Sequence, residues 1–272
     1  MPLLSLDQLT VVGVSPAELV DIAADAGYDA ISAFTSSTDS AGAYRLAKGD
    51  DRTEAMIARL RERGITVSNL EGLVVKPRMD WDDYARLIDL GGRIGARCGA
   101  TVILDKDRAR ATDSFCRLAE MAANGGLGLV LEFCRLTEIG SLAEAVEFVG
   151  LASHPAGVLV DVMHLILGGE TPADIARYDP ALILASQLCD SPATLSDDDY
   201  MRDAFNQREV PGDGELPVVE FLKALPAHAV VGIEVPLKSL AEQGMSHLDR
   251  ARLLLERTRT LLTEAGRTTE AA

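Results

Sequence analysis

Apolar runs rich in valine, isoleucine and leucine recur along the whole chain, separated by amphipathic segments. Most of the runs are continuous rather than alternating with polar residues, which is typical of parallel strands buried on both faces. We predict eight strands, at 6–12, 28–34, 65–73, 100–105, 127–133, 157–163, 182–190 and 229–235.

The segments between the strands have the apolar spacing of helices. Several begin with a capping residue or a first-turn proline, as at Ser15 and Pro16, at Ser141, and at Thr171 and Pro172. We predict helices at 16–26, 52–63, 81–97, 112–123, 142–152, 172–177, 216–225 and 247–265.

Strict alternation of strands and helices predicts an α/β fold of the (β/α)8 TIM barrel type. An open doubly wound sheet is the alternative, but no GxGxxG follows the first strand. No proline- or serine-rich linker divides the chain, so we expect one domain over 1–272, with 266–272 as a frayed tail.

Composition excludes several classes of protein. The 272 residues carry a net charge of −16, a field that repels nucleic acid and anionic membranes. The four cysteines show no CxxC spacing, so neither a disulfide framework nor a thiolate zinc site is expected. The chain has no signal-peptide pattern and no apolar stretch near the roughly 20 residues that span a bilayer. We therefore expect a cytoplasmic protein without nucleic-acid or membrane partners, and leave open a homo-oligomer, dimer or tetramer.

Four successive strand-like segments each end in a side chain that can bind a divalent metal. These side chains are Glu132, Asp161, Gln187 and Glu234. At the C-terminal mouth of a parallel barrel such positions converge, and active sites lie there. Three carboxylates and one amide oxygen favour Mn²⁺ or Mg²⁺, with Co²⁺ or Zn²⁺ as alternatives, and no organic cofactor. Taken singly, each would be an ordinary solvated loop residue, so the prediction depends on their joint occurrence.

Other polar residues fall near the predicted mouth. His164 follows Asp161 by three residues, and we expect it to contact substrate. Arg208, Glu71 and Lys106 are weaker candidates for substrate binding, against structural or solvated roles. The long polar connection 191–209 is predicted to form a lid, with Tyr200 or Phe205 covering the substrate.

These motifs resemble the xylose isomerase-like barrel superfamily, in its sugar phosphate isomerase/epimerase branch. The resemblance covers nearly the whole chain and is carried by LEF, DVMH, QLCD, the RxxPGxGxL of 208–216, and GIEVP. It implies that Glu132 and Glu234 bind the metal and form the acid/base pair. It further implies that Asp161 is a ligand, that His164 contacts substrate, and that Arg208 contacts substrate or a ligand carboxylate.

The chain departs from this pattern at two positions. Ketose 3-epimerases usually have histidine where this chain has Gln187, whereas dehydratase-like relatives carry glutamine. Several dehydroshikimate dehydratases have a catalytic histidine where this chain has Cys134, which is a poor base in its place. The first departure weakens the hypothesis of a sugar epimerase, and the second weakens the hypothesis of a dehydroshikimate dehydratase.

The leading hypothesis is a metal-dependent isomerase or epimerase of a small polyhydroxy carbonyl compound such as a sugar, keto-sugar or cyclitol. Proton transfer by glutamate through an enediolate would perform the reaction. The alternative is a lyase, similar to inosose or dehydroshikimate dehydratases, that expels water or an alcohol from the same enolate. An apurinic-site endonuclease is disfavoured by only four histidines and the charge of −16. A metal-binding barrel without activity, acting as a subunit or sensor, is the remaining alternative.

Overall fold

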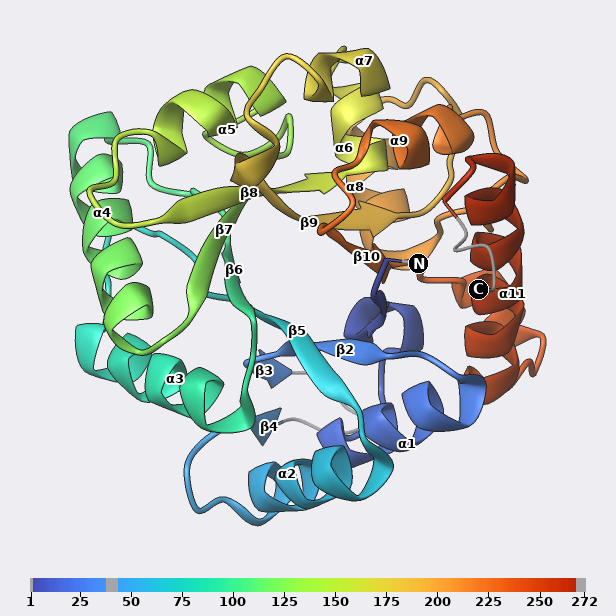
Figure 1. The fold of residues 1–272 in the computed structure, drawn as a ribbon, viewed down its shortest axis with the longest axis horizontal. Helices are drawn as coiled ribbons and strands as arrows, with labels where there is room; N and C mark the ends of the chain where they lie inside the picture. The colour runs from blue at the N-terminus through green and yellow to red at the C-terminus, as the bar shows by residue number, and fades with distance from the viewer. Residues whose placement is uncertain (1, 38–43, 268–272) are drawn as a thin grey trace.

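Eight parallel strands close into a barrel inside a ring of helices in the computed structural model, which describes residues 2–37 and 44–267 (Figure 1). The strand order around the barrel is β1-β10-β9-β8-β7-β6-β5-β2, with β2 pairing back to β1. The fold is the predicted (β/α)8 barrel. The barrel strands are β1 (Leu4–Asp7), β2 (Ala30–Phe34), β5 (Thr66–Glu71), β6 (Cys98–Thr101), β7 (Gly128–Glu132), β8 (Ala156–Asp161), β9 (Ile183–Leu188) and β10 (Val230–Ile233).

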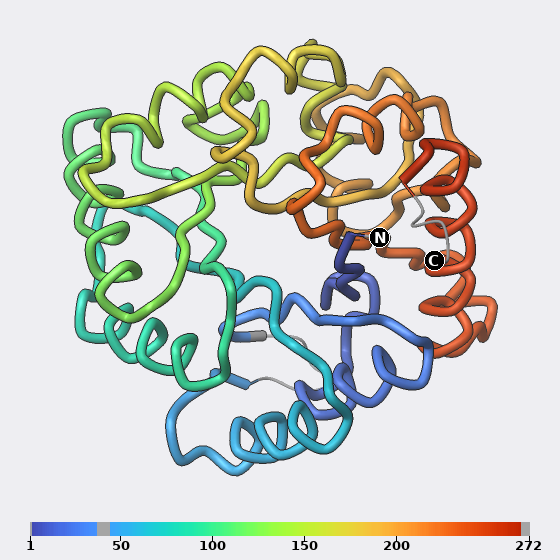
Figure 2. Tube along the Cα trace, viewed as in Figure 1, coloured from blue at the N-terminus to red at the C-terminus, as the bar shows by residue number. Residues whose placement is uncertain are grey.

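The helices pack their apolar faces on the outside of the barrel. α11 lies beside α1, so segments from near the two ends of the chain are neighbours (Figure 2). The helices are α1 (Pro16–Ala26), α2 (Asp51–Arg63), α3 (Trp81–Ile94), α4 (Arg108–Asn124), α5 (Leu142–Val149), α6 (Val162–Leu167), α7 (Pro172–Ile175), α8 (Asp197–Asn206), α9 (Val218–Ala224), α10 (Lys238–Glu242) and α11 (His247–Glu264). Among the described residues, no helix combines the length and apolar character needed to cross a membrane.

The first strand differs from its prediction in a way that matters for the site. The predicted range was 6–12, but β1 ends at Asp7, and Gln8–Val11 form a short 3-10 helix. Val11, which extended the apolar run, is buried in this turn and not in the sheet. Asp7 therefore lies at the C-terminal end of its strand.

The fourth predicted strand, 100–105, is displaced as well, because β6 spans Cys98–Thr101. A Cβ atom at Gly99 would overlap Leu73, so this strand needs its small residues to pack against its neighbour. Ile103 forms only an isolated bridge with Val75 beyond the strand. Lys106 consequently lies well past the strand end and is exposed.

The connection 191–209 contains helix α8 instead of an extended polar loop. Ser196 caps the helix, since its hydroxyl accepts a hydrogen bond from the Asp199 N–H at 3.2 Å. Three aspartates in the first turn complement the helix dipole. A two-stranded antiparallel sheet of β3 (Ser36–Ser37) and β4 (Tyr44–Arg45) was also not predicted.

The end of the described chain is attached to the barrel. Arg267 donates hydrogen bonds to the carbonyls of Leu222, at 2.7 Å, and Pro226, at 3.0 Å. Of the segment expected to fray, 266–272, residues 268–272 lie outside the described residues.

Candidate active site

Polar side chains converge at the C-terminal end of the barrel. Five successive strands in the barrel order, β7, β8, β9, β10 and β1, carry one each, at the strand end or, for β10, directly after it. β5 carries a sixth from across the barrel. Placement at strand ends lets these groups face a cavity while the strands stay apolar. The six residues are Glu132, Asp161, Gln187, Glu234, Asp7 and Glu71.

A cavity of about 410 Å³ lies at this end of the barrel, and Asp7, Asp161 and Gln187 are not among its lining residues. Glu71, Glu132 and Glu234 line it, together with His164 and Arg208. All five were predicted as site residues, and the barrel brings them together. Lys106, the other predicted substrate contact, is not among the lining residues.

Arg208 bridges two of the predicted metal ligands. Its guanidinium is 2% exposed, with Nη1 at 2.6 Å from Oδ2 of Asp161 and Nη2 at 2.9 Å from Oε2 of Glu234. Burial acts to raise the pKa of Asp161, but the charge of Arg208 holds this pKa below its ordinary value. Arg208 thus fixes two carboxylates in addition to lining the cavity.

Asp161 is held from a second direction by the backbone. Its Oδ1 accepts hydrogen bonds from the N–H groups of Met163, at 2.7 Å, and His164, at 3.3 Å, and so caps α6. The spacing of the DVMH motif has a local cause, because the same cap that orients Asp161 starts the helix turn that carries His164.

Gln187 contacts the carboxylates through its nitrogen. Nε2 donates to Oε1 of Glu234 at 3.0 Å and to Oδ2 of Asp7 at 3.3 Å. Oε1 of Gln187 is buried and has no hydrogen-bond partner among the described residues. A buried amide oxygen without a partner is costly, so it identifies a place where a cation or polar ligand would be favourable.

Three neighbouring acids have raised pKa values. Burial raises the pKa of Asp7 to about 7, against hydrogen bonds from Gln187 and Ser5. Burial and the charge of Asp7 raise the pKa of Glu71 to about 8. Burial also raises the pKa of Glu234 well above its ordinary value, although Arg208 opposes this shift. Ionising all three carboxylates therefore costs free energy, because the positive charge nearby is too small to compensate them.

The sequence analysis missed Asp7. The acid ends the run LSLD, just as Glu132 ends VLE and Asp161 ends LVD, so the signal was present but masked by the misplaced strand. A Cβ atom at Gly232 of β10 would overlap the Asp7 carboxylate, so glycine there leaves the room that this buried acid occupies.

His164 belongs to a chain of polar contacts. Its Nε2 lies 3.4 Å from Oε1 of Glu132, and its Nδ1 lies 2.6 Å from the hydroxyl of Tyr200. That hydroxyl is 3.2 Å from Sγ of Cys134. Tyr200 is fully buried, so it positions His164, whereas Phe205 is 56% exposed at the cavity edge.

Arg135, which the sequence analysis did not single out, fastens α8 over the site. Its guanidinium lies 4.4 Å from the ring centroid of Tyr200. Nη2 also donates to the carbonyl of Leu195 at 2.9 Å and lies 3.1 Å from Oδ1 of Asp197. The start of α8 and its buried tyrosine are thereby attached to the loop after β7.

Five of the described acids and His164 form two groups, and within each group the ligand atoms lie within 4.8 Å of one another. One contains Glu132, Asp161 and His164, and the other contains Asp7, Glu71 and Glu234. The predicted ligands are thus divided between two adjoining groups, which Arg208 connects through Asp161 and Glu234. Gln187 contacts only the second group, through Asp7 and Glu234. An oxygen-rich donor set with an unpartnered amide oxygen fits a hard divalent cation.

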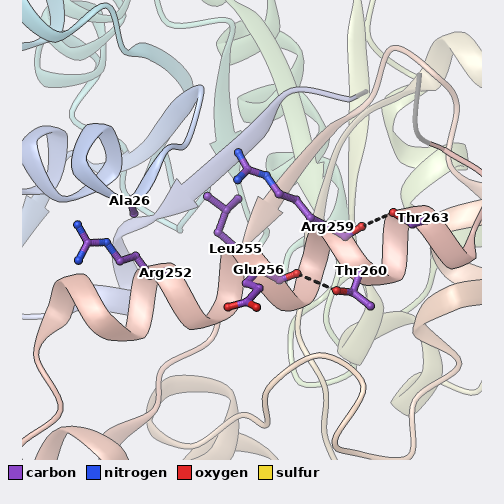
Figure 3. Close-up of a pocket in the computed structure, with 7 residues that line it drawn as sticks. All are labelled: Ala26, Arg252, Leu255, Glu256, Arg259, Thr260 and Thr263. Atoms are coloured by element: carbon purple, nitrogen blue, oxygen red, sulfur yellow. Dashed lines mark hydrogen bonds between the residues drawn. The ribbon is translucent and has the colours of Figure 1, made fainter. Parts of the chain in front are cut away.

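A further hollow, of about 430 Å³, lies along α11 beside the end of α1 (Figure 3). Thr260 and Thr263 direct their hydroxyls to carbonyls of the same helix. Arg252 and Arg259 donate to the carbonyls of Asp25 and Gly27. None of these groups belongs to the carboxylate site.

Residues 20–251 match the family model described as xylose isomerase-like TIM barrel. A search of curated protein sequences finds no match. Solved structures with the same fold include the IolI protein with a bound zinc atom, with a TM-score of 0.76 and 17% identity over 97% of this chain and 99% of that one.

Two other solved structures with this fold are described as enzymes. An L-ribulose 3-epimerase has a TM-score of 0.73 and 15% identity, covering 98% of this chain and 96% of its own. The probable 3-DHS dehydratase AsbF from Bacillus anthracis has a TM-score of 0.73 and 14% identity, covering 94% and 98%. At these identities the likeness shows the fold alone.

Proposed function

The chain belongs to the xylose isomerase-like TIM barrel family, and on that premise we propose that it is a divalent-metal-dependent isomerase or epimerase of a small hydroxy-carbonyl compound. The observation that carries the proposal is the convergence of five carboxylates at one end of the barrel, three of which line one cavity. The IolI protein, which shares the fold, binds zinc, and an L-ribulose 3-epimerase shares it as well.

Glu132, Asp161, Gln187 and Glu234 are the residues that would hold the metal. For Gln187 this requires the amide to turn, because Nε2 and not Oε1 faces Glu234. The bound metal would supply Lewis acidity that polarises the carbonyl of the substrate. Arg208 keeps the carboxylates of Asp161 and Glu234 in place through its two ion pairs.

Glu132 and Glu234 are the proposed acid/base pair. They come from different strands, and both line the cavity. One carboxylate removes the proton from the carbon beside the carbonyl, and the other returns a proton at the neighbouring carbon or on the opposite face. His164 directs Nε2 toward Glu132 and is positioned to contact a substrate oxygen.

Substitution of Glu234 by glutamine tests this assignment. We expect Glu234→Gln to fold, because Arg208 keeps its pair with Asp161, but to lose metal and turnover. Metal content is measured by elemental analysis, and folding by circular dichroism. The control is Glu242→Gln, whose glutamate is 67% exposed on α10. Full activity in Glu234→Gln would refute the proposed roles.

The reaction type is decided with candidate hydroxy ketones, Mn²⁺ and deuterated solvent. Exchange of a carbon-bound proton without loss of water supports isomerisation or epimerisation. Stoichiometric dehydration would instead support the lyase alternative. AsbF, a probable dehydratase, shares the fold. Metal retention without any exchange across the substrate set would indicate an inactive, metal-binding barrel.

A further inference from the structure

The wall of the cavity differs in character from its carboxylate floor. Four of the six large apolar side chains that are exposed in the described chain line this one cavity. They come from the loops after β6 and β7 and from α8, and all lie beyond the strand ends. These residues are Leu104, Leu136, Met201 and Phe205, which are 48%, 39%, 43% and 56% exposed.

The polar side chains of the wall are already engaged. The hydroxyl of Thr137 lies 2.9 Å from the carbonyls of Cys134 and Ile139. The hydroxyl of Tyr200 contacts His164 and Cys134. Among the described lining residues, the groups left for a ligand are therefore the carboxylates of the floor and His164.

No described side chain of the cavity is suited to a phosphate group. Arg208 is the one arginine or lysine among the described lining residues, and both of its terminal nitrogens contact Asp161 or Glu234. Three glutamates line the same space, and none of them offers positive charge to a dianion. A polyhydroxy chain would likewise find few hydrogen-bond partners along the wall.

From this division we infer that the substrate is an unphosphorylated hydroxy-carbonyl compound with a hydrocarbon substituent, which packs against Leu104, Leu136, Met201 and Phe205. The inference rests on the proposed function, which places the hydroxy-carbonyl end at the floor. Burial of the substituent removes apolar surface from water on both partners. This substrate class differs from the polyhydroxy compounds that the sequence analysis expected.

Hydroxamic acids test this inference, because their two oxygens chelate divalent metals as a hydroxy-carbonyl unit would. The probes are acetohydroxamic, benzohydroxamic and threonohydroxamic acid, titrated calorimetrically into the Mn²⁺-loaded protein. We expect benzohydroxamate to bind at least about tenfold tighter than acetohydroxamate, because its ring adds apolar contact. Threonohydroxamate, which carries hydroxyls in place of the ring, should bind no tighter than acetohydroxamate.

A matched pair of leucine variants tests whether the affinity for benzohydroxamate depends on the apolar wall of the cavity. Leu104 and Leu151 are both 48% exposed, but Leu151 does not line the cavity. Leu104→Ser should weaken benzohydroxamate about fivefold through the lost apolar contact, and leave acetohydroxamate unchanged. Leu151→Ser should change neither affinity.

The outcomes separate the inference from the proposal beneath it. The apolar substrate class is overturned if all three hydroxamates bind with equal affinity, or if threonohydroxamate binds tightest. Either result would leave the proposed metal site unaffected. Absence of binding by every hydroxamate overturns the proposed metal site and the inference together. A change in sedimentation coefficient of Leu104→Ser, with benzohydroxamate affinity unaltered, would assign these side chains to a contact between subunits and overturn the inference.

Discussion

Asp7 should make the metal-free protein less stable as the pH rises. Its pKa is about 7 in the folded protein, against an ordinary value of 3.8. Between these two values the folded state holds a proton that the unfolded state has released, so each pH unit lowers the unfolding free energy by about 1.4 kcal/mol. Across the interval from about pH 4 to pH 7 the loss sums to about 4 kcal/mol. Glu71, whose pKa is raised to about 8, lowers the stability of the folded protein in the same direction as the pH rises.

Asp7→Asn isolates this contribution. Asparagine carries no charge at any pH in the range, so the variant loses the slope that Asp7 contributes. We expect the two proteins to be similarly stable near pH 4. At pH 8 without metal, the variant should exceed the wild type by up to about 4 kcal/mol. Asp89→Asn is the control, because Asp89 is exposed on α3.

The assay is urea denaturation followed by circular dichroism in EDTA, repeated in Mn²⁺. Because a cation stabilises ionised carboxylates in the folded state only, Mn²⁺ should flatten the wild-type pH dependence and raise its stability. The reasoning is refuted if Asp7→Asn and the wild type keep the same slope in EDTA between pH 4 and pH 8.

Three other perturbations test separate parts of the site. Tyr200→Phe removes the hydroxyl that faces Nδ1 of His164, so the ¹⁵N chemical shift of Nδ1 should change. An unchanged shift would contradict the positioning role of Tyr200. Gly232→Ala places a methyl group against the Asp7 carboxylate and should cost about 1–3 kcal/mol in urea denaturation, whereas no loss would show that Asp7 has room to move. Arg208→Met removes the cation that two buried carboxylates share. The metal-free protein should lose about 3–5 kcal/mol, and Mn²⁺ should raise its Tm by more than in the wild type; an equal rise would contradict the shared charge.

The barrel and the strand-end acids could be predicted because both are local properties of the sequence. A buried parallel strand is a continuous apolar run, and an acid that ends it, such as Glu132 or Asp161, is recognisable without knowing its neighbours. Asp7 was missed where this rule is weakest, since the apolar residues of the following 3-10 turn look like a continued strand. Helix α8 was missed for the opposite reason, because its aspartate-rich start resembles a polar loop.

Contacts between distant segments could not be predicted. Arg208 follows α8 and reaches Asp161, on β8, and Glu234, after β10, only because the barrel closes. Its role as a bridge rather than a free substrate contact therefore depends on tertiary structure. The same holds for Tyr200, whose buried hydroxyl meets His164 only when α8 packs over the mouth.

The orientation of the Gln187 amide depends on the charges around it. Its Nε2 donates to Asp7 and Glu234, and this leaves Oε1 without a partner. An amide that presented Oε1 to the same two carboxylates would bring three acceptors together, which is favourable only when a cation or a proton lies between them. The histidine usual in ketose epimerases could not donate two hydrogen bonds from one atom in this way. The orientation of this one amide, rather than the number of acids, therefore separates the metal-free arrangement from one that holds a cation.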